Sequence, residues 1–207
     1  MAREEWTRAK AAKNHVREAL ESMTRGAVRC MYCDDNRGTD IDHFQPLENA
    51  PLRAFEWPNH LLACSWCNSN AKRSLYPVDA DGVCLLVDPS AEDPAGHLRL
   101  LLKSGLYEPV AKSVKGSETI RVFGLNRSEL VKGRMDAFYR SRSMLRDWHL
   151  RCQDADPDAN RVAQALLDSP FIDVVYAMIR LKPAVAGVVV GPETVPALEA
   201  WRAEHSL

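Results

Sequence analysis

Apolar residues recur at three- and four-residue steps near the start of the chain. Trp6, Val16 and Leu20 belong to this stripe in residues 3–24, and charged residues lie between them. An apolar stripe at this spacing, opposite a polar face, is typical of an amphipathic helix. The pattern therefore predicts an N-terminal helix over residues 3–24.

A longer stripe follows in the second half of the chain. Asn126 precedes Glu129 by three residues, as in a helix capping box. The apolar positions of the long helix predicted after it are Val131, Met135, Phe138, Leu145 and Trp148. Its other faces carry Lys and Arg, which either line a nucleic-acid path or face water. Prolines separate further helices, which we expect at 159–167, 170–181 and 193–204.

The segment between these helices is rich in turns. Residues 83–87 (VCLLV) predict a strand or a buried run, Ser104-Gly105 predicts the turn of a hairpin, and Ser117 predicts the start of a short helix. We therefore predict an α+β fold that is mostly helical, with a small core and helical N- and C-terminal extensions. The expected segments are residues 1–26, 27–76, 77–125 and 126–207.

Composition places the chain among soluble globular proteins, with 46% hydrophobic and 27% charged residues. It contains no run of about 18 apolar residues, so no membrane span is expected. The N-terminal stretch MAREEWTRAK is charged and lacks the apolar region of a signal peptide, which favours a cytoplasmic location with reduced thiols. Because the formal net charge is −1, binding of nucleic acid would depend on local basic surfaces.

Four of the six cysteines form two pairs, each with two residues between its thiols. The pairs are Cys30 with Cys33 and Cys64 with Cys67. Two such pairs supply the four thiolates of a tetrahedral structural zinc site, which has no open position for catalysis. The alternative, four unrelated buried cysteines, does not account for the paired spacing.

The residues between and after these pairs have the chemistry of a phosphodiester hydrolase. Asp42 offers a hard oxygen ligand for Mg²⁺, and Asn68 offers an amide oxygen. His43 is a candidate base for deprotonating water, although a lone histidine more often packs in a core. Lys72 lies four residues after Asn68, on the same helix face, where it can touch a phosphate oxygen. Neighbouring strand residues face opposite ways, so Asp42 and His43 must lie at a strand end to serve one site.

The stretches CMYC, DIDHFQP, WPNHLLACSWCN and AK resemble the motif of the HNH nuclease family in order and spacing. The resemblance covers about a fifth of the chain and implies a ββα-metal core braced by the four cysteines. It implies that His43 is the general base and that Asn59 orients the loop around it. It further implies that Asp42 and Asn68 bind a catalytic Mg²⁺ or Mn²⁺. Asn68 stands where many family members have His, and Lys72 comes one residue later than the commonest spacing.

Residues 85–134 carry a second resemblance. The stretches LLVDPSAEDPAGHLRL and KGSETIRVFGLNRSELVKGR look like the region that follows the HNH motif in bacterial anti-phage nucleases of the Septu and retron-associated type. In those systems the nuclease works beside an ATPase. The resemblance therefore implies a role in anti-phage defence and an ATPase partner.

The function predicted from these features is a metal-dependent HNH endonuclease that cuts DNA, and the sequence does not separate DNA from RNA as the target. Arg37, Lys72 and Arg73 flank the motif and are the predicted nucleic-acid contacts, although each alone is more often solvated. The low net charge implies a partner protein or an oligomer that adds contacts. The alternative is a non-catalytic zinc module that binds nucleic acid or protein, in which Asp42 and His43 are incidental.

Overall fold

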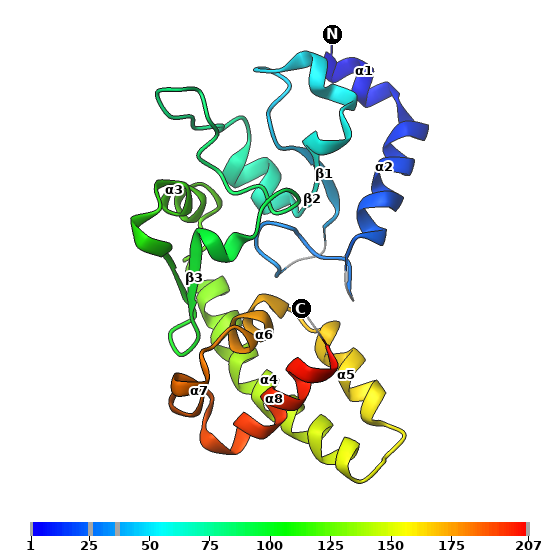
Figure 1. Cartoon of the computed structure of the whole chain (residues 1–207). Helices are drawn as coiled ribbons and strands as arrows, with labels where there is room; N and C mark the ends of the chain where they lie inside the picture. The colour runs from blue at the N-terminus through cyan, green and yellow to red at the C-terminus, as the bar shows by residue number, and fades with distance from the viewer. Residues whose placement is uncertain (1, 25–26, 36–37, 206–207) are drawn as a thin grey trace. The chain divides into compact units, whose positions relative to one another are not determined.

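The computed structural model describes residues 2–24, 27–35 and 38–205. The chain divides into two compact units, which are described separately below. They comprise Met1–Arg99 with Tyr107–Arg127, and Leu100–Leu106 with Ser128–Leu207. The described residues are mostly helical and include two two-stranded sheets (Figure 1). This confirms the predicted α+β class.

The N-terminal segment forms two helices where the sequence predicts one. They are α1 (Ala2–Arg8) and α2 (Lys10–Ser22), and Ala9 between them has a ψ of 57°, outside the helical region. The helices pack on different elements, because α1 contacts η1 (Pro51–Phe55) and α2 contacts the strand β2 (His60–Ala63). The apolar spacing therefore predicts the helical content but not the break.

A small antiparallel hairpin lies at the centre of the first unit. β1 (Asp40–His43) pairs with β2 (His60–Ala63), with Asp40 opposite Ala63 and His43 opposite His60. All four residues of β2 are buried. Gly38 leads into β1 where the backbone passes close to β2, since a Cβ there would lie 2.8 Å from the Cβ of Leu62. The hairpin is thus anchored in the core and has a fixed register.

After β2 the chain turns into η3, a short π-helix at Trp66–Lys72. The amide of Arg73 donates to the carbonyl of Asn68, five residues earlier, at 2.8 Å. π-helical turns are rare and are frequently found at functional sites. The wider winding places Lys72 on the buried side of this helix, where its side chain has no exposed surface.

Two predictions for the middle of the chain meet different outcomes. The turn at Ser104-Gly105 is confirmed, because it joins β3 (Leu98–Leu101) to β4 (Leu106–Pro109). Residues 83–87 form no strand, since Cys84 makes only an isolated bridge to Val78, but the run is buried at Leu86 and Val87. The hydroxyl of Thr119 accepts from the amide of Val87 and holds this buried end.

The residues predicted to cap two helices do not cap them in the structure. Helix α3 (Val114–Phe123) begins after Ser113, whose hydroxyl accepts from the amide of Gly116, so Ser117 is not its cap. Asn126 does not cap the long helix, because its side chain exchanges two hydrogen bonds with the backbone of Tyr107. Short single turns complete this unit and the next: η2 (Trp57–Asn59), η4 (Pro94–Gly96), η5 (Val110–Lys112) and η6 (Pro192–Thr194).

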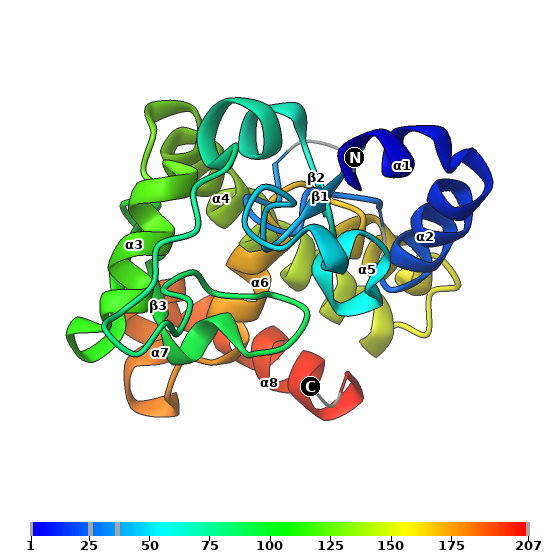
Figure 2. The same cartoon turned by 90° about the horizontal axis from the view of Figure 1, so that it is seen from above.

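The second unit is helical around one long helix. Helix α4 (Ser128–Gln153) contacts α5 (Ala159–Leu167), α6 (Ile172–Ile179) and α8 (Val195–Glu204) (Figure 2). Trp148 of α4 packs edge to face on Trp201 of α8, with ring centroids 4.8 Å apart. Helix α7 (Pro183–Val190) is additional to the helices that the sequence predicts.

Several basic side chains of α4 are already paired within this unit. Arg142 and Arg146 both lie near Glu193, at 2.7 and 3.5 Å. Arg134 is buried, and its Nε donates to the carbonyl of Gly105.

Among the described residues, no single helix is long and apolar enough to span a membrane, and only the bent pair of α5 and α6 meets that test jointly.

Candidate functional site

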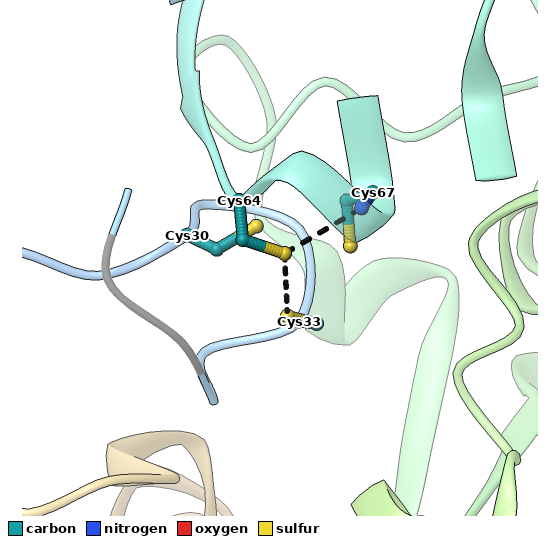
Figure 3. Close-up of side chains that lie close together, drawn as sticks. All are labelled: Cys30, Cys33, Cys64 and Cys67. Atoms are coloured by element: carbon teal, nitrogen blue, oxygen red, sulfur yellow. Dashed lines mark hydrogen bonds between the residues drawn. The ribbon is translucent and has the colours of Figure 1, made fainter. Parts of the chain in front are cut away.

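The four predicted cysteines come together in the first unit. Their sulfur atoms all lie within 4.8 Å of one another, and all four side chains are buried. Figure 3 shows the sulfurs pointing toward a common centre, with Cys33 Sγ 3.9 Å from Cys64 Sγ. Four thiolates around a tetrahedral zinc ion at about 2.3 Å have this kind of separation. The cluster therefore fits a structural zinc ion.

The hairpin positions both cysteine pairs. Cys64 directly follows the last residue of β2, and Cys67 lies in η3. The loop with Cys30 and Cys33 is tied to the same strand, since the amide of Met31 donates to the carbonyl of Leu62 at 2.8 Å. Hydrogen bonding among the thiols lowers the pKa of Cys33 and Cys64 and raises the pKa of Cys30 and Cys67. The fold thus favours the thiolate, the form that binds metal, at two of the four cysteines.

His43 ends β1 and faces a backbone carbonyl. Its Nε2 lies 3.1 Å from the oxygen of Ala54. Burial lowers the pKa of His43 to about 4, and the positive charges of Lys72 and Arg3 act in the same direction. The ring is therefore neutral at pH 7. With its proton on Nε2 and donated to Ala54, the lone pair of Nδ1 is the basic position of the ring.

His60 and Trp6 complete the surroundings of His43. The Nε2 atom of His60 also lies 3.1 Å from the oxygen of Ala54, so one carbonyl serves two imidazoles. The ring of Trp6, from α1, lies 4.8 Å from both histidine rings, edge-on to His43 and stacked on His60. Burial lowers the pKa of His60 too. This face of the hairpin is thus neutral and aromatic.

Asn59 braces the loop that carries the Ala54 carbonyl. Its side-chain oxygen accepts from the amide of Gln45 at 2.7 Å, and its amide group donates to the carbonyls of Gln45 and Arg53 at 3.1 and 3.2 Å. Asn59 is fully buried. Three hydrogen bonds from one buried side chain fix both ends of residues 45–53, and the position of Ala54 follows from them.

Asp42 is held by two other side chains. Lys72 Nζ lies 3.0 Å from Oδ2 of Asp42 and 2.8 Å from the carbonyl oxygen of His43. The hydroxyl of Tyr32 donates to Oδ2 of Asp42 at 2.5 Å. Burial raises the pKa of the Asp42 carboxyl, and Lys72 and Tyr32 oppose that shift. The aspartate thus belongs to a buried ion pair with a supporting hydroxyl.

Asn68 contacts a different carboxylate. Its side-chain nitrogen lies 3.3 Å from Oδ2 of Asp40, which shares a strand face with Asp42. Asp42 contacts Tyr32 and Lys72, whereas His43 contacts Ala54, His60 and Trp6. The structure therefore places Asp42 and Asn68 against separate partners, and it places His43 on the other side of the strand.

The predicted nucleic-acid contacts differ in accessibility. Arg73 is exposed, just after η3, and Lys72 is fully buried. Arg37 lies outside the described residues. Sequence reasoning missed Tyr32, His60 and Trp6 as neighbours of the site. His60 can be identified as a neighbour only from the hairpin register, which sets it opposite His43.

Two curated proteins are similar to this chain, and both are Septu protein PtuB. The protein from Bacillus mycoides (strain KBAB4) is 26% identical over 148 residues, which cover 58% of this chain and 49% of that protein. The protein from Bacillus thuringiensis is 26% identical over 129 residues, which cover 59% of this chain and 46% of that protein. No protein-family model and no solved structure matches the chain. The chain thus spans about half the length of the curated relatives it matches.

Proposed function

We propose that the chain is a metal-dependent endonuclease that hydrolyses phosphodiester bonds of DNA. The observation that supports this most is the environment of His43. Its Nε2 lies 3.1 Å from the carbonyl of Ala54, which follows the segment that Asn59 braces. An imidazole that donates its Nε2 proton to a backbone carbonyl keeps the lone pair of Nδ1, which can accept a proton from water.

In this proposal His43 acts on water. Nδ1 takes a proton as the water oxygen attacks phosphorus in line; the bond from phosphorus to the leaving oxygen breaks, and that oxygen takes a proton from solvent. Asn59 keeps the segment before Ala54 in place and so orients the ring. To hold Mg²⁺ or Mn²⁺ together, Asp42 and Asn68 would have to exchange their contacts with Lys72 and Asp40, and the ion would then stabilise negative charge on the phosphate. Arg73, which is exposed near the end of η3, is the proposed phosphate contact.

A nicking assay on the zinc-loaded chain tests this function. Supercoiled plasmid with Mg²⁺ or Mn²⁺ should be cut, and His43→Ala should reduce the rate by about 100-fold or more. His15→Ala is the matched control, because His15 is an exposed histidine on α2 of the same unit. A structured RNA run in parallel separates DNA from RNA as the target. Equal rates for wild type and His43→Ala would remove His43 from the mechanism.

The similarity to Septu proteins supports a role in anti-phage defence, and we propose an ATPase partner for this chain. The test is plating of phage on cells that carry the gene with its chromosomal neighbours. Protection should depend on His43 and on a neighbouring ATPase, and the two proteins should co-purify. Protection that persists in the His43→Ala strain would contradict a nuclease role in defence.

One observation favours the alternative, a non-catalytic zinc module. The carboxylate of Asp42 already has a cationic partner in Lys72, and Asn68 contacts Asp40. A binding module predicts that the chain retains nucleic acid equally with and without Mg²⁺. It also predicts no change in His43→Ala. Gel-shift measurements on the same two proteins decide between the functions.

A further inference from the structure

The side chain of Lys72 occupies a position lined by oxygen atoms. Its Nζ lies 3.0 Å from Oδ2 of Asp42, 3.2 Å from Oδ1 of Asp42 and 2.8 Å from the carbonyl oxygen of His43. Lys72 has no exposed side-chain surface and Asp42 is 4% exposed. A carboxylate and a backbone carbonyl are also ligands that hard divalent cations use. The ammonium thus fills a site with the donor chemistry of a metal site.

We propose that Lys72 and a divalent cation compete for these three oxygens, so that Lys72 must leave before Asp42 binds metal. This inference rests on the proposed nuclease function and concerns how the same site is loaded. Two cations at one buried carboxylate repel each other strongly, because little water lies between them. Lys72 therefore keeps the apo site closed and makes metal binding weaker than the oxygens alone would give.

The local backbone allows such an exchange. Lys72 is the last residue of η3, and Arg73 after it has a φ of 50° and an exposed side chain. Residues 73–77 form no strand or helix, although the amides of Arg73 and Leu75 donate to the carbonyls of Asn68 and Lys72. A lysine side chain at the end of an element can leave its pocket by changing its rotamer, without breaking these backbone hydrogen bonds. Tyr32 can keep its hydrogen bond to Asp42 throughout.

Amine labelling of the unmodified chain tests the exchange without any substitution. A lysine-reactive reagent is added to the zinc-loaded protein with and without Mg²⁺, and labelled peptides are quantified by mass spectrometry. We expect Lys72 to react at least about tenfold faster in saturating Mg²⁺, because the population with the ammonium outside its pocket rises. Lys132, whose side chain is 78% exposed, is the control and should not respond. Equal protection of Lys72 in both conditions would overturn the proposal.

Binding of Mn²⁺, followed by electron paramagnetic resonance, gives the second test. Lys72→Met should bind Mn²⁺ about tenfold or more tightly than wild type, and Asp42→Asn with Lys72→Met should lose that gain. Binding in Lys72→Met no tighter than in wild type would contradict competition. If that variant does not fold, the labelling result decides alone. Neither readout involves nucleic acid, so the absence of cleavage would count against the nuclease function and leave this inference standing.

Discussion

The first unit contains two buried polar clusters on the same hairpin, and they differ in how their charge is balanced. At one end four thiols face one another within 4.8 Å. On β1 the carboxylate of Asp42 is instead matched by the ammonium of Lys72 and the hydroxyl of Tyr32. Four thiolates in one place need a cation to be stable, because buried like charges repel. The Asp42 cluster is complete without one.

Under the proposals above, one metal would build the fold and the other would compete for its ligands. Zinc bound at the cysteines would contribute directly to folding, because the unfolded chain holds no such site. At Asp42 the folded chain already has a charge partner in Lys72. The free energy of binding a second cation there would be only the difference between the metal-bound state and the state with Lys72 in place.

Loss of zinc should have the largest effect on stability. Chelation, or Cys67→Ser, should unfold the first unit, since structural zinc sites contribute about 10–16 kcal/mol in zinc-finger peptides. Metal analysis should find about one zinc per chain before chelation, as expected for a closed four-thiolate site. Melting curves before and after chelation provide the measurement. Cys152→Ser is the control, because Cys152 is exposed and outside the cluster. An unchanged melting temperature after complete zinc removal would contradict a structural role.

Lys72→Met should destabilise the first unit by about 3–5 kcal/mol, because it leaves a buried carboxylate without its partner. Asp42→Asn in the same chain should recover much of that loss. Urea unfolding of both variants measures the effect. Lys132→Met is the matched control, since its ion pair with Asp136 is exposed and contributes about 0–1 kcal/mol. Equal losses for the two lysines would remove the distinction between a buried pair and a surface pair.

The contrast also explains how much the sequence can predict. The cysteine pairs are recognisable because each is local, and the cluster needs only that two pairs meet. Helices with strong apolar stripes, such as α4, are predicted for the same reason. The partner of Asp42 is different, because Lys72 lies 30 residues away and no local pattern joins them. The partnership of His43 with His60 likewise depends on strand register.

Capping residues show the same limit at shorter range. Asn126 and Glu129 have the spacing of a capping box, but a neighbouring segment uses the Asn126 side chain to hold the backbone of Tyr107. Ser113 starts α3 four residues before the serine that the pattern favours. Local sequence offers several residues able to cap a helix, and tertiary contacts select among them. The apolar period therefore predicts helices better than it predicts their ends.

Asn59→Ala should have an intermediate effect, about 2–3 kcal/mol, because three hydrogen bonds of a buried side chain are lost together. It should also let the segment before Ala54 shift, which would change the resonances of the His43 ring in an NMR spectrum. Asn70→Ala is the control, since Asn70 is exposed and makes one hydrogen bond, to the carbonyl of Ser65. A loss no greater than in the control would show that the loop holds its shape without Asn59.

The smallest effect that we predict is a dependence of stability on pH through His43. The folded state lowers the pKa of this ring from 6.5 to about 4, so between these values the unfolded chain binds more protons. Stability is then complete above pH 6.5 and falls as the pH drops toward 4. Water reaches part of the ring, which reduces the size of the effect.

His43→Gln keeps a donor for the Ala54 carbonyl and removes the titration, so its stability should fall less between pH 7 and about 4.5 than that of wild type. The Nε2 of His60 contacts the same carbonyl, so protonation of His60 also changes stability with pH. Lys72 and Arg3 add positive charge near His43. His60→Gln is therefore measured beside His43→Gln. Urea unfolding at each pH gives both slopes. Identical slopes in wild type and His43→Gln would mean that the fold does not lower the pKa of this ring.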